Sequence, residues 1–179
     1  MRCAIYQPPQ TADGQSVPVV YWLSRLTCTD VDFMQKAGAR RIAAELGLAM
    51  VAPETSPRGA DVADDDGYNP GQGARFCVDA TQTPWNRHYR MYDYVLNELP
   101  HLIEATVPVS DKPSVLGHSM GGHGALVLAL RNPERFQSVS ACSPIAKRCC
   151  PGNCRGRTDI VCPFNRASLW VPLRIVYLC

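Results

Sequence analysis

A G-x-S-x-G motif at residues 117–121 (GHSMG) constrains the fold of this 179-residue chain more than any other feature. The motif follows an apolar run at 113–116 that predicts a β-strand, and a run of small and apolar residues at 120–130 predicts a helix. Glycines on both sides of the serine allow strand and helix to turn sharply around it. The sequence therefore predicts Ser119 at the tip of a strained strand-to-helix turn.

The other apolar runs alternate with helical patterns, which favours a mainly parallel sheet flanked by helices, the α/β class. The first two expected strands are separated by a turn at residues 13–14 and should pair as a hairpin. A strand at 113–116 should lie between neighbours rather than at an edge. The expected strands are 3–6, 17–23, 48–52, 113–116 and 136–142, and the expected helices are 30–46, 89–104 and 120–130.

Capping residues mark the helix at 30–46, since Thr29 or Asp30 can cap its start and Gly47 can end it. In the helix at 89–104, Pro100 predicts a kink. The apolar positions that should face the core are Phe33, Ala37, Ile42, Ala43 and Leu46 in the first helix, and Tyr92, Val95, Leu96, Leu99 and Leu102 in the second.

A long connection at 53–86 is rich in proline and glycine and carries an acidic run at 64–66, so no regular element is expected there. Loops of this length are usually functional or mobile. It is interpreted either as a substrate-side loop or as a solvated excursion.

Ser119 is the candidate nucleophile, because a helix N-terminus favours developing negative charge and leaves the Met120 N–H available to an oxyanion. The simpler alternative is that Ser119 only caps the helix. The loop that leaves the strand at 17–23 would supply a second donor, for which the Leu26 N–H is the candidate. A plain connecting turn is the alternative there.

Nine segments of the chain form one distinctive pattern: 21–24, 26–28, 52–59, 71–74, 79–82, 84–86, 92–94, 97–100 and 117–122. Together they resemble the S-formylglutathione hydrolase family, also called esterase D, over about residues 1–146. The resemblance implies an α/β-hydrolase fold, truncated at its C-terminus, and hydrolysis of S-formylglutathione to glutathione and formate in formaldehyde detoxification. It also implies Ser119 as nucleophile, the Leu26 and Met120 N–H groups as oxyanion donors, no cofactor and a possible homodimer.

Three residues depart from the family pattern, which has glycine at Arg25 and Arg75 and commonly tyrosine at Cys77. An arginine in a position with positive φ would be strained by roughly 1 to 2 kcal/mol. Arg25 would then crowd the oxyanion loop. An alternative is that Arg25 binds the glutathione carboxylates.

The acid and histidine of a catalytic triad, which follow the nucleophile in this fold, are not identifiable. Beyond Ser119 the only acidic residues are Glu134 and Asp159, and the only histidine is His123, in the helix behind the turn. The three earlier histidines, His88, His101 and His118, are interpreted as structural or surface residues. We therefore expect this chain to be inactive.

The family pattern ends near residue 146, which divides the chain into a partial hydrolase domain at 1–146 and an unrelated tail at 147–179. Residues 1–146 hold 12 Lys and Arg against 15 Asp and Glu, whereas the tail holds 6 against 1 and five of the nine cysteines. The abrupt change resembles a shifted reading frame, and the tail is expected to be irregular. Its cysteine spacing does not form a zinc motif, so no metal is expected.

Two other functions remain open at this point: a general carboxylesterase of the same fold, or a non-catalytic hydrolase remnant with a metal-binding or interaction tail. The scattered basic residues lack interleaved aromatics, which argues against nucleic-acid binding. No stretch approaches the roughly 20 apolar residues of a membrane span, and no secretory signal is recognisable. The expected location is the cytoplasm.

Overall fold

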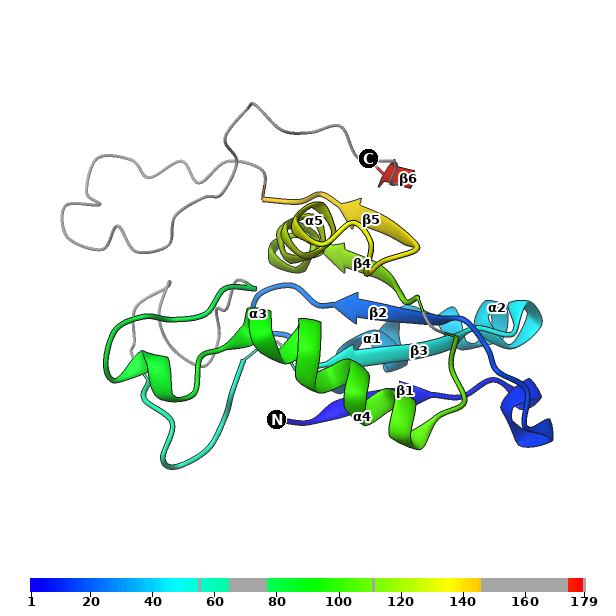
Figure 1. The fold of residues 1–179 in the computed structure, drawn as a ribbon, viewed down its shortest axis with the longest axis horizontal. Coiled ribbons are helices and arrows are strands. Elements are labelled where there is room, and N and C mark those ends of the chain that lie inside the picture. Colours follow the sequence, from blue (N-terminus) through cyan, green and yellow to red (C-terminus); the bar gives the residue numbers. More distant parts are fainter. Residues whose placement is uncertain (55, 65–76, 111, 146–173, 179) are drawn as a thin grey trace.

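A six-stranded sheet organises the computed structural model, which describes residues 1–54, 56–64, 77–110, 112–145 and, as backbone, 174–178. The strand order is β1-β3-β2-β4-β5-β6; β1 is antiparallel to β3, and all other neighbours are parallel (Figure 1). The strands are β1 (Cys3–Tyr6), β2 (Val19–Leu23), β3 (Ala49–Pro53), β4 (Ser114–His118), β5 (Ser138–Cys142) and β6 (Arg174–Leu178).

The centre of the sheet is β4, which pairs with β2 on one side and β5 on the other. This confirms the expected mostly parallel sheet and the interior position of the strand before Ser119. Strand β3 is buried at all five positions, as expected for a strand covered on both faces.

The expected hairpin between the first two strands is wrong. β1 pairs with β3, with Ala4 opposite Ala52, and β2 lies on the other side of β3. The connection from β1 to β2 contains a 3-10 helix at Pro9–Asp13 and is long enough to step past one strand. This arrangement places β2 in the interior of the sheet, where both of its faces can be covered.

The expected helix at 30–46 is two helices, α1 (Asp30–Lys36) and α2 (Ala39–Leu46), separated at Gly38 with φ 62°. The capping box at Thr29 and the left-handed Gly47 agree with the prediction. Because the chain turns at Gly38, the helical spacing does not continue across it. Ile42 and Leu46, expected in the core, are 44% and 64% exposed.

The expected helix at 89–104 runs from Met91 to Thr106 and includes a π-helical stretch, Tyr94–Glu98, between α3 (Met91–Asp93) and α4 (Leu99–Thr106). Pro100 has no N–H, so it cannot donate a hydrogen bond to the carbonyl of Leu96, four residues earlier. The Arg135 guanidinium donates to this Leu96 oxygen instead, at 2.8 Å. The wider turn shifts the buried face. Leu102 is therefore half exposed, and Ile103 is fully buried in its place.

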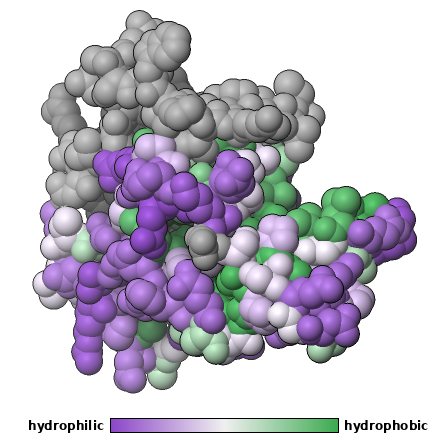
Figure 2. Space-filling model, turned by 45° about the vertical axis from the view of Figure 1, so that its right-hand side comes forward, coloured by the Kyte–Doolittle hydropathy of each residue, from purple (hydrophilic) through white to green (hydrophobic). Residues whose placement is uncertain are grey.

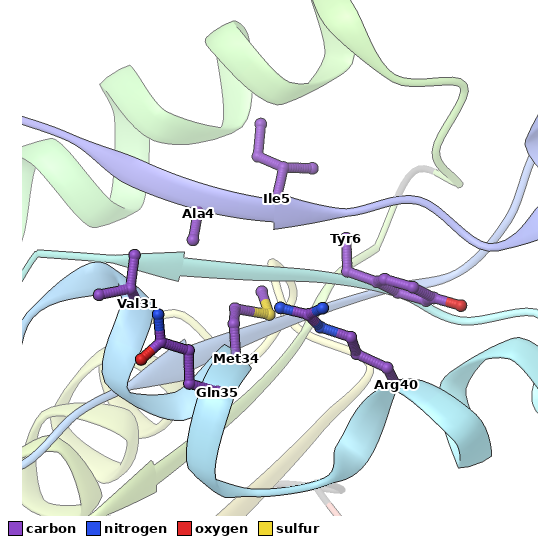
Figure 3. A pocket seen from close by; sticks show the side chains of 7 residues that line it. All are labelled: Ala4, Ile5, Tyr6, Val31, Met34, Gln35 and Arg40. Atoms are coloured by element: carbon purple, nitrogen blue, oxygen red, sulfur yellow. The ribbon is translucent and has the colours of Figure 1, made fainter.

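Helices cover both faces of the sheet, with α3 and α4 in front and α1 and α2 behind in Figure 1. The larger core packs α4 and α5 (Met120–Arg131) on the strands through residues such as Val95, Leu128 and Val139. The smaller core packs α1 and α2 on β1 and β3 through Met34 and Ala43. A cavity of about 310 Å³ opens beside it, between β1, α1 and α2 (Figure 3).

Hydrophobic residues reach the surface between hydrophilic ones on the face shown in Figure 2. Among the described residues, the large hydrophobic side chains that are more than one-third exposed include Ile5 at 38% and Val31 at 44%, and both line the cavity of Figure 3. No helix among the described residues is long and apolar enough to cross a membrane. The described residues also hold no cluster of three or more His, Cys, Asp or Glu suited to a metal.

The tail at 147–179 was expected to be irregular, but its residues 174–178 form a strand, β6, which pairs in parallel with β5. Strand pairing is a property of the fold that composition does not reveal. Residues 146–173, and with them most of the tail, lie outside the described residues, as does Arg75.

Candidate active site

Ser119 lies at the turn between β4 and α5, with φ 56° and ψ −113°, a backbone conformation that is unusual for a residue other than glycine. Hydrogen bonds hold it there: its N–H donates to the Cys142 carbonyl at 2.9 Å, and its carbonyl accepts from the N–H groups of His123 at 3.0 Å and Ile145 at 3.2 Å. Such a conformation costs about 1 to 3 kcal/mol and persists only when its surroundings fix it. The backbone around Ser119 is thus the strained turn that the motif predicts.

The two glycines of the motif are required by close packing. A Cβ on Gly117 would lie 2.2 Å from the Gly121 carbonyl oxygen, and a Cβ on Gly121 would lie 1.9 Å from the Leu23 carbonyl oxygen. Any side chain would therefore separate β4 from α5, or α5 from the end of β2. This contact also brings the loop after β2 against the start of α5.

Met120 is the first residue of α5, so its N–H has no acceptor within the helix and lies at the positive end of the helix dipole. Its side chain is buried, with 2% exposure, which anchors the backbone at this point. A backbone N–H fixed in this way can stabilise an oxyanion formed at the adjacent serine.

Leu26 lies in a turn that is closed by a hydrogen bond from the Cys28 N–H to the Arg25 carbonyl at 3.3 Å. Thr27 takes the left-handed position of this turn, with φ 66°. The Leu26 N–H makes no hydrogen bond to any residue that the structure describes. The loop is anchored at Ser24, which is 2% exposed and whose hydroxyl accepts from the Trp22 indole at 2.8 Å.

The strain expected at Arg25 is absent, because its φ is not positive; the left-handed residue of this loop is Thr27. Arg25 is exposed, so its side chain extends from the loop instead of filling the core. The third departure, Cys77, is buried, with its Sγ only 2.5 Å from where a Cβ on Gly124 would lie.

No described residue donates a hydrogen bond to, or accepts one from, the Ser119 hydroxyl. His123 follows Ser119 by one turn of α5, and His118 is the last residue of β4. A groove is lined by His101, Glu134 and Pro113. Pro113 directly precedes β4, whereas Ser119 directly follows β4. These two titratable residues therefore lie at the opposite end of the strand.

Sequence reasoning missed an ion-pair cluster around two buried carboxylates at the carboxyl end of β3. Glu54 is 3% exposed and accepts from the Arg2 guanidinium at 3.0 Å, while the Arg58 Nε lies 3.7 Å from it. Asp30, 7% exposed, lies 3.7 Å from the same Arg2 group. The hydrogen bond from Arg2 to Glu54 raises the pKa of Arg2. A glutamate directly after a buried strand was the available signal, since a buried carboxylate requires a partner.

Parallel strands end at the same edge of a sheet, so this cluster lies at the edge that also carries Ser119, two strands away. Asp30 begins α1, which follows the loop containing Leu26. The ion pairs therefore tie the N-terminus of the chain to the element after that loop.

Comparison with known proteins agrees with the fold described above. The chain is similar to an S-formylglutathione hydrolase from Agrobacterium tumefaciens, with 52% identity and a TM-score of 0.77 over 80% of this chain and 52% of that one. An S-formylglutathione hydrolase from Staphylococcus aureus (20% identity, TM-score 0.58, 80% of this chain and 51% of that one) shares the fold. A ferulic acid esterase from Anaeromyces mucronatus also shares the fold, with 16% identity and a TM-score of 0.62 over 79% of this chain and 52% of that one.

The chain thus spans about half the length of these solved relatives. A family model described as "Putative esterase" matches residues 1–174, which extends beyond residue 146, where the sequence resemblance ends, to the first residue of β6. With a mostly parallel sheet, a strained serine turn and this match, the chain belongs to the esterase family of α/β-hydrolases.

Proposed function

We propose that Ser119 is the nucleophile of a serine thioesterase site that converts S-formylglutathione and water to glutathione and formate. The observation that carries the proposal is the positive-φ serine between β4 and α5 in a chain 52% identical to an S-formylglutathione hydrolase. This substrate would place the reaction in formaldehyde detoxification, with glutathione as the leaving group. No cofactor is needed for it, and the proposed setting is a cytoplasmic protein that can form a homodimer.

The proposed roles follow from acyl-transfer chemistry. The Ser119 hydroxyl attacks the formyl carbon, and the N–H groups of Met120 and Leu26 bind the negative oxygen of the tetrahedral intermediate. Collapse expels the glutathione thiolate and leaves a formyl ester on Ser119, which water then hydrolyses to formate. Both steps require a base that takes a proton first from the serine and then from water.

Residues 1–179 supply the nucleophile and the donors of this proposed site but no identifiable triad acid or histidine after Ser119. Loss of triad members costs on the order of 10⁴ to 10⁶ in turnover. Against an ordinary rate of about 10 per second, the chain alone should turn over at most about 10⁻³ per second. We therefore expect the purified chain to hydrolyse S-formylglutathione no faster than Ser119→Ala.

The experiment measures S-formylglutathione hydrolysis by the chain and by Ser119→Ala, each with and without added imidazole, which can act as an external base. We expect a Ser119-dependent increment only with imidazole, and a formyl group on the Ser119 peptide by mass spectrometry. Subtraction of the Ser119→Ala rate removes hydrolysis by imidazole in solution. Equal rates for the unaltered chain and Ser119→Ala in the presence of imidazole, together with no formylated peptide, would refute the role of Ser119 as nucleophile.

A short aryl ester tested in the same way separates the thioesterase from a general carboxylesterase. A thioesterase should show the larger Ser119-dependent increment with S-formylglutathione. The reverse order would favour the general esterase. Ser119-dependent turnover near 10 per second without imidazole would show that the chain contains a base that we have not identified.

A further inference from the structure

The loop after β2 is fixed against the serine turn, and Arg25 is its first exposed residue. The Leu23 carbonyl lies so close to Gly121 that only glycine fits there, and Ser24 is buried and hydrogen-bonded to Trp22. Trp22 in turn stacks on Phe33 of α1, with ring centroids 4.1 Å apart. The backbone that leads into Arg25 is therefore held in place by the residues that precede it.

The position of Arg25 places its side chain within reach of the region around Ser119. Arg25 follows Leu23 by two residues, a span of at most about 7 Å. Gly121, which contacts Leu23, follows Ser119 by two residues as well. A long, flexible arginine side chain at this point can reach a ligand that extends from the serine across the loop.

The Arg25 guanidinium has no partner among the described residues, where it forms neither an ion pair nor a hydrogen bond. Lys36 of α1 is close enough to Arg25 for their positive charges to interact, although the hydrogen bond to Asp32 dominates and raises the pKa of Lys36. Lys36 is itself neutralised by an ion pair with Asp32 at 2.5 Å. The charge left over next to the loop is thus the positive charge of Arg25.

We infer that Arg25 binds a carboxylate of the thiol part of the substrate and so favours thioesters of acidic thiols over those of neutral thiols. The inference rests on the proposed function, in which the leaving group is glutathione, a tripeptide with two free carboxylates. A guanidinium matches a carboxylate with two parallel hydrogen bonds, which few other side chains can do. Arg25 is thereby a specificity-determining residue on the loop that carries the Leu26 N–H.

The magnitude follows from a charge-assisted hydrogen bond at an exposed site. Hydrogen bonds to charged groups are stronger than neutral ones, but solvent screening reduces the contribution of an exposed pair. Loss of Arg25 should therefore weaken binding of an acidic ligand about threefold to fivefold at low salt. The effect should shrink as salt is raised.

The test uses S-hexylglutathione, a thioether that has no acyl group and so binds without any reaction at Ser119. Its dissociation constant is measured by calorimetry for the chain, for Arg25→Ala and for Arg25→Lys, beside the dimethyl ester of the same ligand, which lacks both carboxylates. The matched control is Arg40→Ala, because Arg40 also has no ion pair with a described residue and lies on α2, away from the loop.

We expect Arg25→Ala to weaken binding of S-hexylglutathione about threefold to fivefold and Arg25→Lys to weaken it less. Binding of the diester, and binding by the Arg40→Ala variant, should be unaffected. Equal losses for acid and diester, or no loss at all, would overturn the role of Arg25 while leaving the Ser119 proposal in place. Absence of binding by the unaltered chain would also overturn it. Formylation of Ser119, measured separately, decides the proposed function.

Discussion

Gly121→Ala tests the contact between the serine turn and the end of β2. In an ordinary helix this change would stabilise the protein by up to about 1 kcal/mol, because alanine is the better helix former. Here the new Cβ would lie 1.9 Å from the Leu23 oxygen and 2.6 Å from the Ser24 oxygen, both backbone atoms, whereas ordinary contact begins at 3.4 Å. The start of α5 and the end of β2 must therefore move apart by about 1.5 Å, the difference between 1.9 and 3.4 Å. Overpacking of this kind costs typically 1 to 3 kcal/mol and occasionally more, so we expect a net loss near 3 kcal/mol.

The assay is urea unfolding followed by far-ultraviolet circular dichroism, with the same urea dependence assumed for all variants. Gly14→Ala is the matched control. Gly14 has positive φ, at 73°, and a Cβ there meets nothing within 4 Å, so only backbone strain of about 1 to 2 kcal/mol should appear, without any steric contact. Gly121→Ala as stable as the unaltered chain would refute the contact, and with it the fixed position that we assign to the loop after β2.

Two further predictions concern titratable groups. Hydrogen bonds from Lys36, and then from Thr29, hold the pKa of the partly exposed Asp32 well below its usual range, so its contribution to stability is present above about pH 4 and lost as the pH falls. Asp32→Asn should therefore reduce the loss of stability between about pH 5 and 2 in urea unfolding, and an unchanged loss would contradict this. Burial raises the pKa of Cys77 to about 12, so iodoacetamide at pH 8 should modify it only in urea. The half-buried Cys28 should react in the folded chain; equal rates for both thiols would show that Cys77 is not enclosed.

The sequence was sufficient for features whose cause is local. The left-handed Gly47, the capping box at Thr29 and the motif around Ser119 can each be recognised from residues within a few positions of one another, although contacts with Cys142 and Ile145 also hold the serine turn. Alternation of apolar runs with helical patterns was enough to predict a mostly parallel sheet with β4 inside it. The proposed site could be recognised for the same reason, since five consecutive residues form its turn.

Local patterns failed where distant segments compete for the same surface. The hairpin between β1 and β2 was wrong because β3 pairs with both of them. Leu102 was expected in the core, but the π-helical stretch before Pro100 brings Ile103 there instead. Its compensating hydrogen bond comes from Arg135, thirty-nine residues after the carbonyl that accepts it.

By itself, the sequence determined the family, the class of fold and the position of the strained turn at Ser119, because each is encoded in short contiguous patterns. Only the tertiary structure decided that Gly121 must be glycine against Leu23, that the buried Glu54 pairs with the exposed Arg2, and that Arg25 on the loop has no partner among the described residues. These properties depend on burial and on distances between segments that are remote in the chain. Both are set by how the sheet orders its strands, which no local pattern contains.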